Sequence, residues 1–369
     1  MPFGMPEFIP GLELARLYYR EAVQPILEDK YPDLVYSAGL IGPGSEVLGF
    51  DTEMSTDHNW GARAVIFLSG QDHARIADDL NTTLGYNLPF VFRRYPTHFE
   101  GVPDEPGTVV PRMNNRRPIN HRVHITTLRG FLQSYVGIEH DQELTVFDWL
   151  TIPEQKLRSL VAGAVFHDGL NVLGPLRRKL AWYPHELWLY LLSAQWRRIG
   201  QEEPFVGRTG VARDEVGSAI IASRLVRDLM RLCLLMEKEY APYSKWFGSA
   251  FARLDCASLL GPIFEEVLWA RNWRDRERHL AAVYEIVAAM HNDLGITKPV
   301  PAKVSPFHDR PFMVIQGGAI ARLIWEAIQD SEVRNLAYGV GKVDQYVDST
   351  DVLSHTGRCR ELSVLYRER

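Results

Sequence analysis

A glycine–serine pair, followed at short range by acidic and amide side chains, is the part of this sequence best suited to chemistry. Gly44 and Ser45 are followed by Asp57 and Asn59. A turn without a bulky side chain lets backbone N–H groups and a hydroxyl approach a triphosphate. Acidic side chains at positions i and i+2 of a strand project from one face and can share divalent cations. The spacing therefore predicts a metal-dependent nucleotidyl transfer site, with Asp57 and Asn59 as catalytic and metal-binding residues.

Asn59 stands where this chemistry calls for a second carboxylate. Its amide oxygen can coordinate a cation but supplies no charge, which should weaken cation binding and slow the reaction. Three explanations remain open: a natural degenerate site, a working one-metal variant, or a deliberate Asp→Asn change. An alternative acidic pair, Asp51 and Glu53, follows Ser45 more closely than such a site requires.

The wider pattern around these residues resembles the nucleotidyltransferase superfamily, whose signature is Gly-Ser, a gap, and then two acids one residue apart. The run Gly44–Asp51 and Ser55–Gly61 is similar to a narrower, uncharacterised bacterial family with a nucleotidyltransferase-like N-terminus and a helical domain of unknown function. That resemblance implies an aspartate at the position of Asn59. It continues through Arg177, Tyr183-Pro184, Asp214-Glu215, Tyr243-Ser244-Lys245-Trp246 and Asp344-Gln345.

The superfamily resemblance also implies a third acid on a later strand. The segment 121–127, which alternates as a strand should, contains no acid. His124 is its best-placed polar residue, because it shares a face with Arg122 and Thr126. His124 is therefore a weak candidate metal ligand, and the commoner interpretation is a histidine on the surface of a strand.

The elements that must position these residues divide the chain into two parts. Helical spacing predicts helices over 11–30, 71–84 and 128–135, and short apolar runs predict strands over 34–41 and 63–68. Residues 85–118, rich in proline and arginine, are expected to form a long insertion. Beyond residue 153 the pattern is almost entirely helical, with helices over 186–199, 214–240, 245–260 and 274–294.

We therefore expect an α+β protein: a small nucleotidyltransferase-like mixed-sheet domain over residues 1–150, followed by a larger all-helical domain over 151–369 that selects the acceptor. A chain of 369 residues exceeds the usual size of one domain.

Two groups of cations in the helical part are candidates for binding a triphosphate. Arg224 belongs to a stripe at helical spacing with Arg213, Arg227 and Arg231, for which a salt-bridged face is the commoner explanation. Lys245 lies among large aromatic residues and either covers the edge of the core or reaches a phosphate. Lys245 and Arg224 are thus predicted nucleotide-binding residues, with Gly44 and Ser45.

Composition narrows the class of partner. The net charge is −5, which argues against a general nucleic-acid-binding surface. The three cysteines show no metal-ligand spacing, and no apolar run approaches the length of a membrane span. Residues 1–4 lack the pattern of a signal peptide, so a cytoplasmic, soluble protein is expected.

The sequence therefore predicts a protein that binds a nucleoside triphosphate with Mg²⁺ and transfers the nucleoside monophosphate to a hydroxyl group. A small-molecule acceptor is favoured over RNA or protein. The alternative is a catalytically degenerate nucleotide-binding sensor or interaction protein. The acceptor, the base preference and the oligomeric state do not follow from the sequence.

Overall fold

The computed structural model describes residues 8–105, 107–139 and 143–367, so the N-terminal residues considered above for a signal peptide lie outside it. The chain forms two compact units, each built from two segments. The first unit comprises residues 1–143 and 156–181, and the second comprises residues 144–155 and 182–369. The expected division into consecutive domains at residue 150 differs from this arrangement, because a strand that follows residue 160 completes the sheet of the first unit.

The first unit contains a four-stranded mixed sheet in the order β7-β2-β1-β8. Its strands are β1 (Tyr36–Leu40), β2 (Arg63–Leu68), β7 (Arg122–Thr126) and β8 (Ala164–Asp168). β1 runs antiparallel to β2 and β8, whereas β2 and β7 are parallel. The predicted α+β class is thus confirmed, but the expectation of an all-helical domain over 151–369 is wrong at β8 and at two later strands, Ser305–Phe307 and Arg310–Val314.

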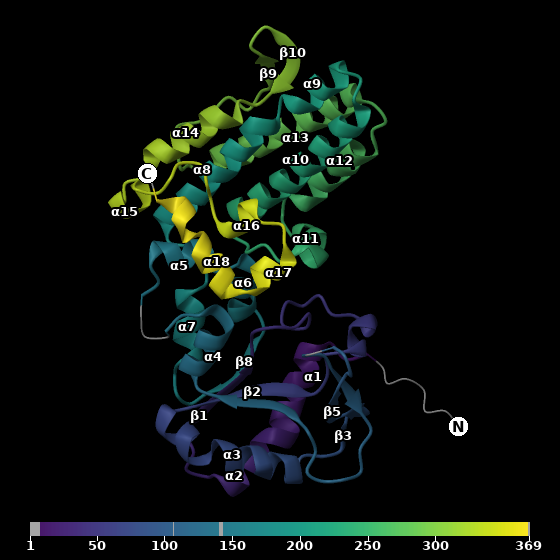
Figure 1. The fold of residues 1–369 in the computed structure, drawn as a ribbon, viewed down its shortest axis with the longest axis vertical. Helices are drawn as coiled ribbons and strands as arrows, with labels where there is room; N and C mark the ends of the chain where they lie inside the picture. The colour runs from purple at the N-terminus through teal and green to yellow at the C-terminus, as the bar shows by residue number, and fades with distance from the viewer. Residues whose placement is uncertain (1–7, 106, 140–142, 368–369) are drawn as a thin grey trace, which may run out of the picture. The chain divides into compact units, whose positions relative to one another are not determined.

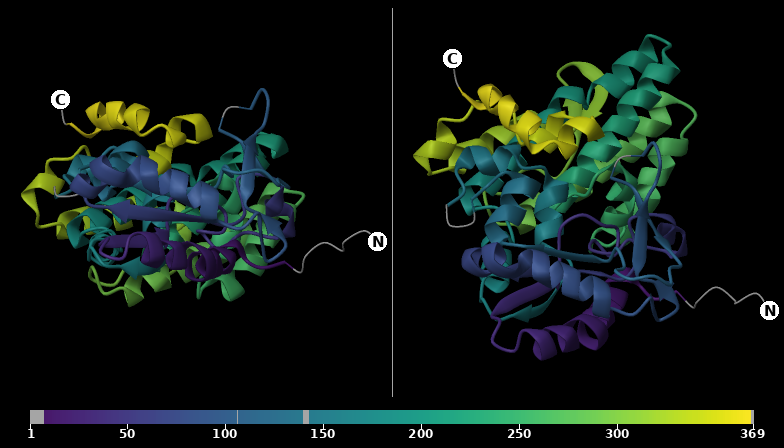
Figure 2. Two further views of the ribbon diagram at one scale, coloured as in Figure 1. Left: turned by 90° about the horizontal axis from the view of Figure 1, so that it is seen from below. Right: turned by 60° about the horizontal axis from the view of Figure 1, so that its bottom comes forward.

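Helices cover both faces of this sheet. On one face, α1 (Gly11–Tyr18) and α3 (Gly70–Asn87) share a core with alternate residues of β1, β2 and β7. On the other face, Phe131 of α4 (Leu128–Val136) packs edge-on against Phe67, with ring centroids 5.5 Å apart. The two faces alternate along β2, as a pleated strand requires. In Figures 1 and 2, α3 runs alongside the strands of the sheet.

The remaining elements of the first unit agree with the sequence only in part. The helix expected over 11–30 is continuous but passes through a π-helical turn. The long insertion is not structureless, because it folds into two hairpins. The bounds are Tyr19–Val23 (π-helix) and Gln24–Lys30 (α2), Glu53–Asp57 (3-10 helix), Val91–Phe92 (β3), Tyr95–Pro96 (β4), His98–Gly101 (β5), Val109–Arg112 (β6) and Leu173–Lys179 (α7). The chain passes between the units within α6 (Glu154–Val161).

The second unit is a helical bundle around α8 (His185–Glu202), which is buried along most of its length. α8 packs against α10 (Glu215–Met236) and α14 (Gly317–Ala327). The helices approach closely at Gly200, where a Cβ would overlap the backbone of Gly318. α10 packs in turn against α13 (Trp273–Asp293). The long helices of this unit lie side by side in Figure 2.

The rest of the second unit consists of short helices and one hairpin. The single helix expected over 245–260 is wrong: it divides into α11 and α12, because a turn at 252–256 separates them. The bounds are Val146–Thr151 (α5), Phe205–Val211 (α9), Ser244–Phe251 (α11), Ala257–Trp269 (α12), Ser305–Phe307 (β9), Arg310–Val314 (β10), Ser331–Arg334 (α15), Val343–Tyr346 (α16), Thr350–Ser354 (α17), Thr356–Glu361 (α18) and Leu362–Tyr366 (3-10 helix).

Candidate functional site

The Gly44–Ser45 turn lies between β1 and β2 and requires a glycine at its first position. Gly44 has a φ of +145°, in the region that favours glycine. A Cβ at this position would overlap the Nη2 atom of Arg63 and the Oε2 atom of Glu46. The carbonyl of Ser45 accepts a hydrogen bond of 2.9 Å from the N–H of Phe50. The side chains of Arg63 and Glu46 therefore leave no room for a Cβ at Gly44, and a backbone hydrogen bond from Phe50 fixes Ser45.

A buried ion pair clamps this turn, and sequence reasoning did not identify it. Arg63, the first residue of β2, donates from Nε to Oε1 of Glu46 at 2.6 Å and from Nη2 to the carbonyl of Pro43 at 2.6 Å. Both partners are buried. The only signal in the sequence is an acid directly after Ser45 and a basic residue at the start of the next strand. The pair fixes the backbone of the turn relative to the sheet.

Asp57 and Asn59 do not lie on a strand, so the expectation that they share a strand face is wrong. Asp57 ends a 3-10 helix, and β2 begins four residues after Asn59, at Arg63. The Asp57 carboxylate is 62% exposed, and its Oδ1 lies 2.9 Å from Nδ1 of His58. Asn59 has a φ of +51°, in the left-handed region, whereas residues of a strand have a negative φ. The turn before β2 thus separates residues that a continuous strand would have aligned.

The side chain of Asn59 binds the insertion and β7. Its Oδ1 accepts hydrogen bonds of 3.2 Å from the N–H of Val109 and from Nη1 of Arg122. Its own N–H donates to the carbonyl of Val109 at 2.8 Å. The amide oxygen, which the sequence assigned to a metal, therefore faces a guanidinium group.

In the alternative acidic pair, Asp51 and Glu53, the carboxylate of Asp51 has a structural role. Oδ2 of Asp51 accepts hydrogen bonds from the N–H of Gly11 at 2.6 Å and from Nε1 of Trp60 at 3.0 Å. This carboxylate ties the start of α1 to the loop before β2.

A cavity of about 520 Å³ lies along the edge strand β7. Its lining includes cationic and titratable side chains from three elements: Arg63 of β2, Arg122 and His124 of β7, and His73 and Asp78 of α3. Burial and the nearby charge of Arg63 lower the pKa of Arg122. Partial desolvation lowers the pKa of His124, and the charges of Arg122 and His73 add to this effect. The structure thus places His124 in a cationic cavity.

Lys245 and Arg224 belong to the second unit. Lys245 is exposed at the start of α11, and its Nζ lies 4.9 Å from the centroid of the Trp246 ring. Arg224 pairs with Glu202. The other arginines of the stripe on α10 also have carboxylate partners: Arg227 pairs with Asp348 at 2.6 Å and Arg231 with Glu154 at 2.8 Å. These three arginines therefore form a salt-bridged face, which is the commoner explanation of such a stripe.

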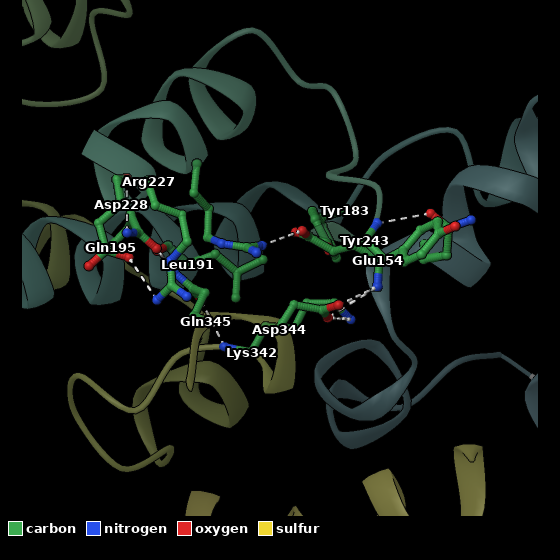
Figure 3. Close-up of polar contacts among 12 residues, drawn as sticks. Glu154, Tyr183, Leu191, Gln195, Arg227, Asp228, Tyr243, Lys342, Asp344 and Gln345 are labelled. Carbon is green, nitrogen blue, oxygen red and sulfur yellow. Dashed lines mark hydrogen bonds and ion pairs between the residues drawn. The ribbon is translucent and has the colours of Figure 1, made fainter. Parts of the chain in front are cut away.

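The most extensive polar network of the second unit surrounds Glu154 and is buried (Figure 3). One carboxylate oxygen of Glu154 accepts from Arg231, and the other accepts from the hydroxyl of Tyr183 at 3.1 Å. The N–H of Glu154 donates to the carboxylate of Asp344 at 3.1 Å. Burial raises the pKa of Glu154, and the charge of Arg231 opposes this shift. Each of these charged groups has a partner, as burial requires.

Lys342 completes this network from the C-terminal segment. Its Nζ donates to the carbonyls of Trp149 and Ile152 and lies 3.8 Å from Oδ2 of Asp344. Burial lowers the pKa of this ammonium group. Gln345, from the same segment, donates to Oε1 of Gln195 on α8 at 2.9 Å. The contacts tie the C-terminal segment to α5 and α8.

Asp168, at the end of β8, caps a helix. Its carboxylate accepts hydrogen bonds from the N–H groups of Val172, Leu173 and Gly174 at the start of α7, and from the hydroxyl of Ser37. Burial would raise the pKa of Asp168, but these hydrogen bonds outweigh it and lower the pKa. The position of Asp168 is explained by the fold alone.

The candidate metal ligands Asp57 and Asn59 fit a divalent cation only in part. The exposed carboxylate of Asp57 suits Mg²⁺, whereas Oδ1 of Asn59 accepts from a guanidinium group and so does not fit as a second ligand. Within residues 8–105, 107–139 and 143–367, no three His, Cys, Asp or Glu side chains are grouped to hold a metal.

Comparison with known proteins finds a match for one part of the chain. Residues 149–247 match a family described as a domain of unknown function (DUF4037). The matched segment contains Glu154, Tyr183 and Arg231 of the buried network, together with Arg224 and Lys245, and ends before Lys342. It does not include Gly44, Ser45, Asp57 or Asn59. No curated protein and no solved structure matches the chain. None of the helices in the part that the structure describes is long and apolar enough to cross a bilayer.

Proposed function

We propose that the protein binds a nucleoside triphosphate with Mg²⁺ in its first unit and transfers the nucleoside monophosphate to a hydroxyl group, with release of pyrophosphate. One observation carries this proposal: the Gly44–Ser45 turn is clamped by Arg63 and Glu46, and Arg63 also lines the cavity along β7. A glycine turn of this kind exposes backbone N–H groups to phosphate oxygens without a side chain between them.

Different residues of the first unit would bind the phosphates and the Mg²⁺. Gly44 and Ser45 would hold phosphate oxygens, and Asp57 would bind the Mg²⁺ that accompanies the triphosphate. Bound Mg²⁺ neutralises phosphate charge and bridges phosphate oxygens. Arg63 would keep the turn in its narrow form, because its guanidinium spans Glu46 and Pro43. Arg224 is committed to Glu202, so the proposal rests on the first unit.

A small molecule is the proposed acceptor. The chain carries a net charge of −5, and RNA or DNA binding usually relies on an excess of basic residues. The proposed location is the cytoplasm, because the triphosphate is most abundant there.

A second candidate function is favoured by the contacts of Asn59. Its amide oxygen is held by Arg122 and Val109, so this position supplies neither charge nor a free oxygen to a metal. A protein with such a site would bind the nucleotide as a sensor or interaction module and would not turn it over.

Calorimetry and a pyrophosphate assay separate these functions. ATP, GTP, CTP and UTP are titrated with MgCl₂ into the full chain, and pyrophosphate release is measured for the protein and for Asn59→Asp. We expect one of the four nucleotides to bind, and Asp57→Asn to weaken its binding in the presence of MgCl₂. Asp29→Asn, at a 70% exposed acid on α2, is the matched control and should leave binding unchanged.

The outcomes distinguish three cases. Pyrophosphate release by the unmodified chain supports the transferase. Binding without release, whether or not Asn59→Asp restores it, supports the sensor. Failure of all four nucleotides to bind the unmodified chain would overturn both.

A further inference from the structure

Arg122 is a partly buried cation without a carboxylate partner. Its Nη1 donates to an amide oxygen, Oδ1 of Asn59, at 3.2 Å, and its guanidinium lies 5.7 Å from the centroid of the Phe99 ring. No Asp or Glu of the described ranges forms an ion pair with it. An arginine in this state remains protonated and gains stabilisation from any anion that reaches it. Since Arg122 lines the cavity along β7, a ligand can reach it.

The surroundings of Arg122 strengthen this attraction. Arg63 is its register neighbour across the parallel pair β2–β7, where adjacent strands lie about 4.8 Å apart. Glu46 forms its ion pair with Arg63, at 2.6 Å, and none with Arg122, although its nearby charge raises the pKa of Arg122. The carboxylate that lines the cavity is that of Asp78, which is exposed on α3. Asn59 matters here because a carboxylate in its place would pair with Arg122.

Two of the three histidines that line the cavity extend its cationic side; the third, His121, is bonded through Nε2 to the carbonyl of Asn81 and accepts at Nδ1 from the N–H of Val123. His124 follows Arg122 by two residues on β7, so the two side chains leave the strand on one face. His73 of α3 lies near enough to His124 for its charge to lower the pKa of the latter. Both rings line the cavity with Arg122. A doubly charged oxyanion would accept hydrogen bonds from the guanidinium and from imidazole N–H groups, and its charge would favour the protonated rings.

We infer that Arg122, His124 and His73 form a binding site for a phosphomonoester dianion at the β7 edge of the first unit. The site lies in the cavity that Arg63 also lines, but that lining does not include Gly44 or Ser45. Its identity as the acceptor site, which would make the acceptor a phosphorylated hydroxyl compound, rests on the proposed function. The binding of the dianion does not.

Titration with phenyl phosphate and with inorganic phosphate tests the site, in the full chain and without nucleotide. We expect saturable binding of phenyl phosphate, weakened at least tenfold in Arg122→Gln. Asn59→Asp should weaken it severalfold, because the new carboxylate competes for Arg122. Arg75→Gln is the control: this arginine lies on α3, is 65% exposed and pairs with Asp72, so its loss should leave binding unchanged. Phenyl phosphate that binds Arg122→Gln as tightly as the unmodified chain overturns the inference.

A measurement on the unmodified chain removes any dependence on how the variants fold. The ring signals of His124 and His73 are followed by NMR as the pH is varied, with and without phenyl phosphate. We expect the pKa of both histidines to rise when the dianion is bound, and an unchanged pKa of His124 contradicts the site. Because nucleotide is absent, a negative result leaves the proposed nucleotide site untouched. Failure of nucleotide binding in the earlier experiment likewise leaves this result standing.

Discussion

Two arginines show how differently the two units use buried or half-buried charge. Arg231 of the second unit donates to Glu154 inside a network that also contains Tyr183 and Asp344. Arg122 of the first unit donates to the amide of Asn59 and lines an open cavity. The charge of Arg231 is neutralised by a carboxylate of the fold, whereas the charge of Arg122 is available to a bound anion. The contrast suggests that charge density alone is a poor guide to a binding site, and that the state of pairing is a better one.

The largest expected effect comes from breaking the paired arginine. Arg231→Met leaves Glu154 buried without its cation, which should destabilise the second unit by about 3–5 kcal/mol. Chemical denaturation followed by circular dichroism measures this loss. Arg278→Gln, which removes a pair with Asp275 at a 68% exposed side chain, should cost about 1 kcal/mol or less. A cost for Arg231→Met that is no greater than that of Arg278→Gln would refute the structural role of the network.

A buried carboxylate of the second unit should make its stability depend on pH. Glu203 accepts hydrogen bonds from the N–H of Ile315, just before α14, at 2.7 Å and from the N–H of Gly317, its first residue, at 3.1 Å. Burial raises its pKa to about 7, although these hydrogen bonds oppose the shift. The folded state therefore holds this proton more tightly than the unfolded state. The resulting stabilisation is complete below the ordinary pKa of a glutamate and is lost as the pH rises through 7.

The size of this effect follows from the shift. At 1.36 kcal/mol for each pKa unit, it amounts to about 3 kcal/mol between pH 4 and pH 8. Denaturation curves across this range should show the loss in the unmodified chain and a flatter profile in Glu203→Gln. Glu265→Gln, at an exposed position on α12, should keep the profile of the unmodified chain. Parallel profiles for the unmodified chain and Glu203→Gln would contradict the assignment.

The smallest effect on stability, but a clear effect on binding, is expected at the turn of the first unit. Gly44→Ala places a Cβ against Arg63 at a φ of +145°, which should cost about 1–3 kcal/mol. Nucleotide affinity should fall at least tenfold, as measured by calorimetry. Gly70→Ala is the control, since a Cβ there meets no atom within 4 Å. Equal affinities of Gly44→Ala and Gly70→Ala would separate the turn from nucleotide binding.

The fold followed from the sequence wherever local pattern decides structure. β2 was predicted with its observed limits, and α8, α10 and α13 within a few residues, because their apolar positions repeat regularly. β8 was missed because five residues within a helical stretch become a strand only through pairing with β1, which is remote in sequence. The hairpins of the insertion were missed for a related reason: their strands are too short to show alternation.

The site was predictable in its residue types but not in its contacts. Gly44 was identified as a turn glycine, and the structure gives it the expected backbone conformation. Its partner Arg63 was not identified, because a clamp between a loop and a strand leaves no periodic signal. Asn59 was assigned to the same strand face as Asp57, but neither residue lies on a strand, and the positive φ of Asn59 is a property of the folded loop. The roles of Gly44, Ser45, Asp57, Asn59, Lys245 and Arg224 in nucleotide binding remain predictions.

The interleaved segments of the two units have a consequence for synthesis. Ser37 on β1 bonds to Asp168 at the end of β8, 131 residues later. A ribosome must therefore release part of the second unit, residues 144–155, before the first sheet can gain its last strand. Lys342 reaches back 193 residues to the carbonyl of Trp149. During translation, β1 therefore stays an unpaired sheet edge until β8 is made, and the carbonyls of Trp149 and Ile152 lack Lys342 for longer still. These are the surfaces on which a nascent-chain chaperone would be expected to act.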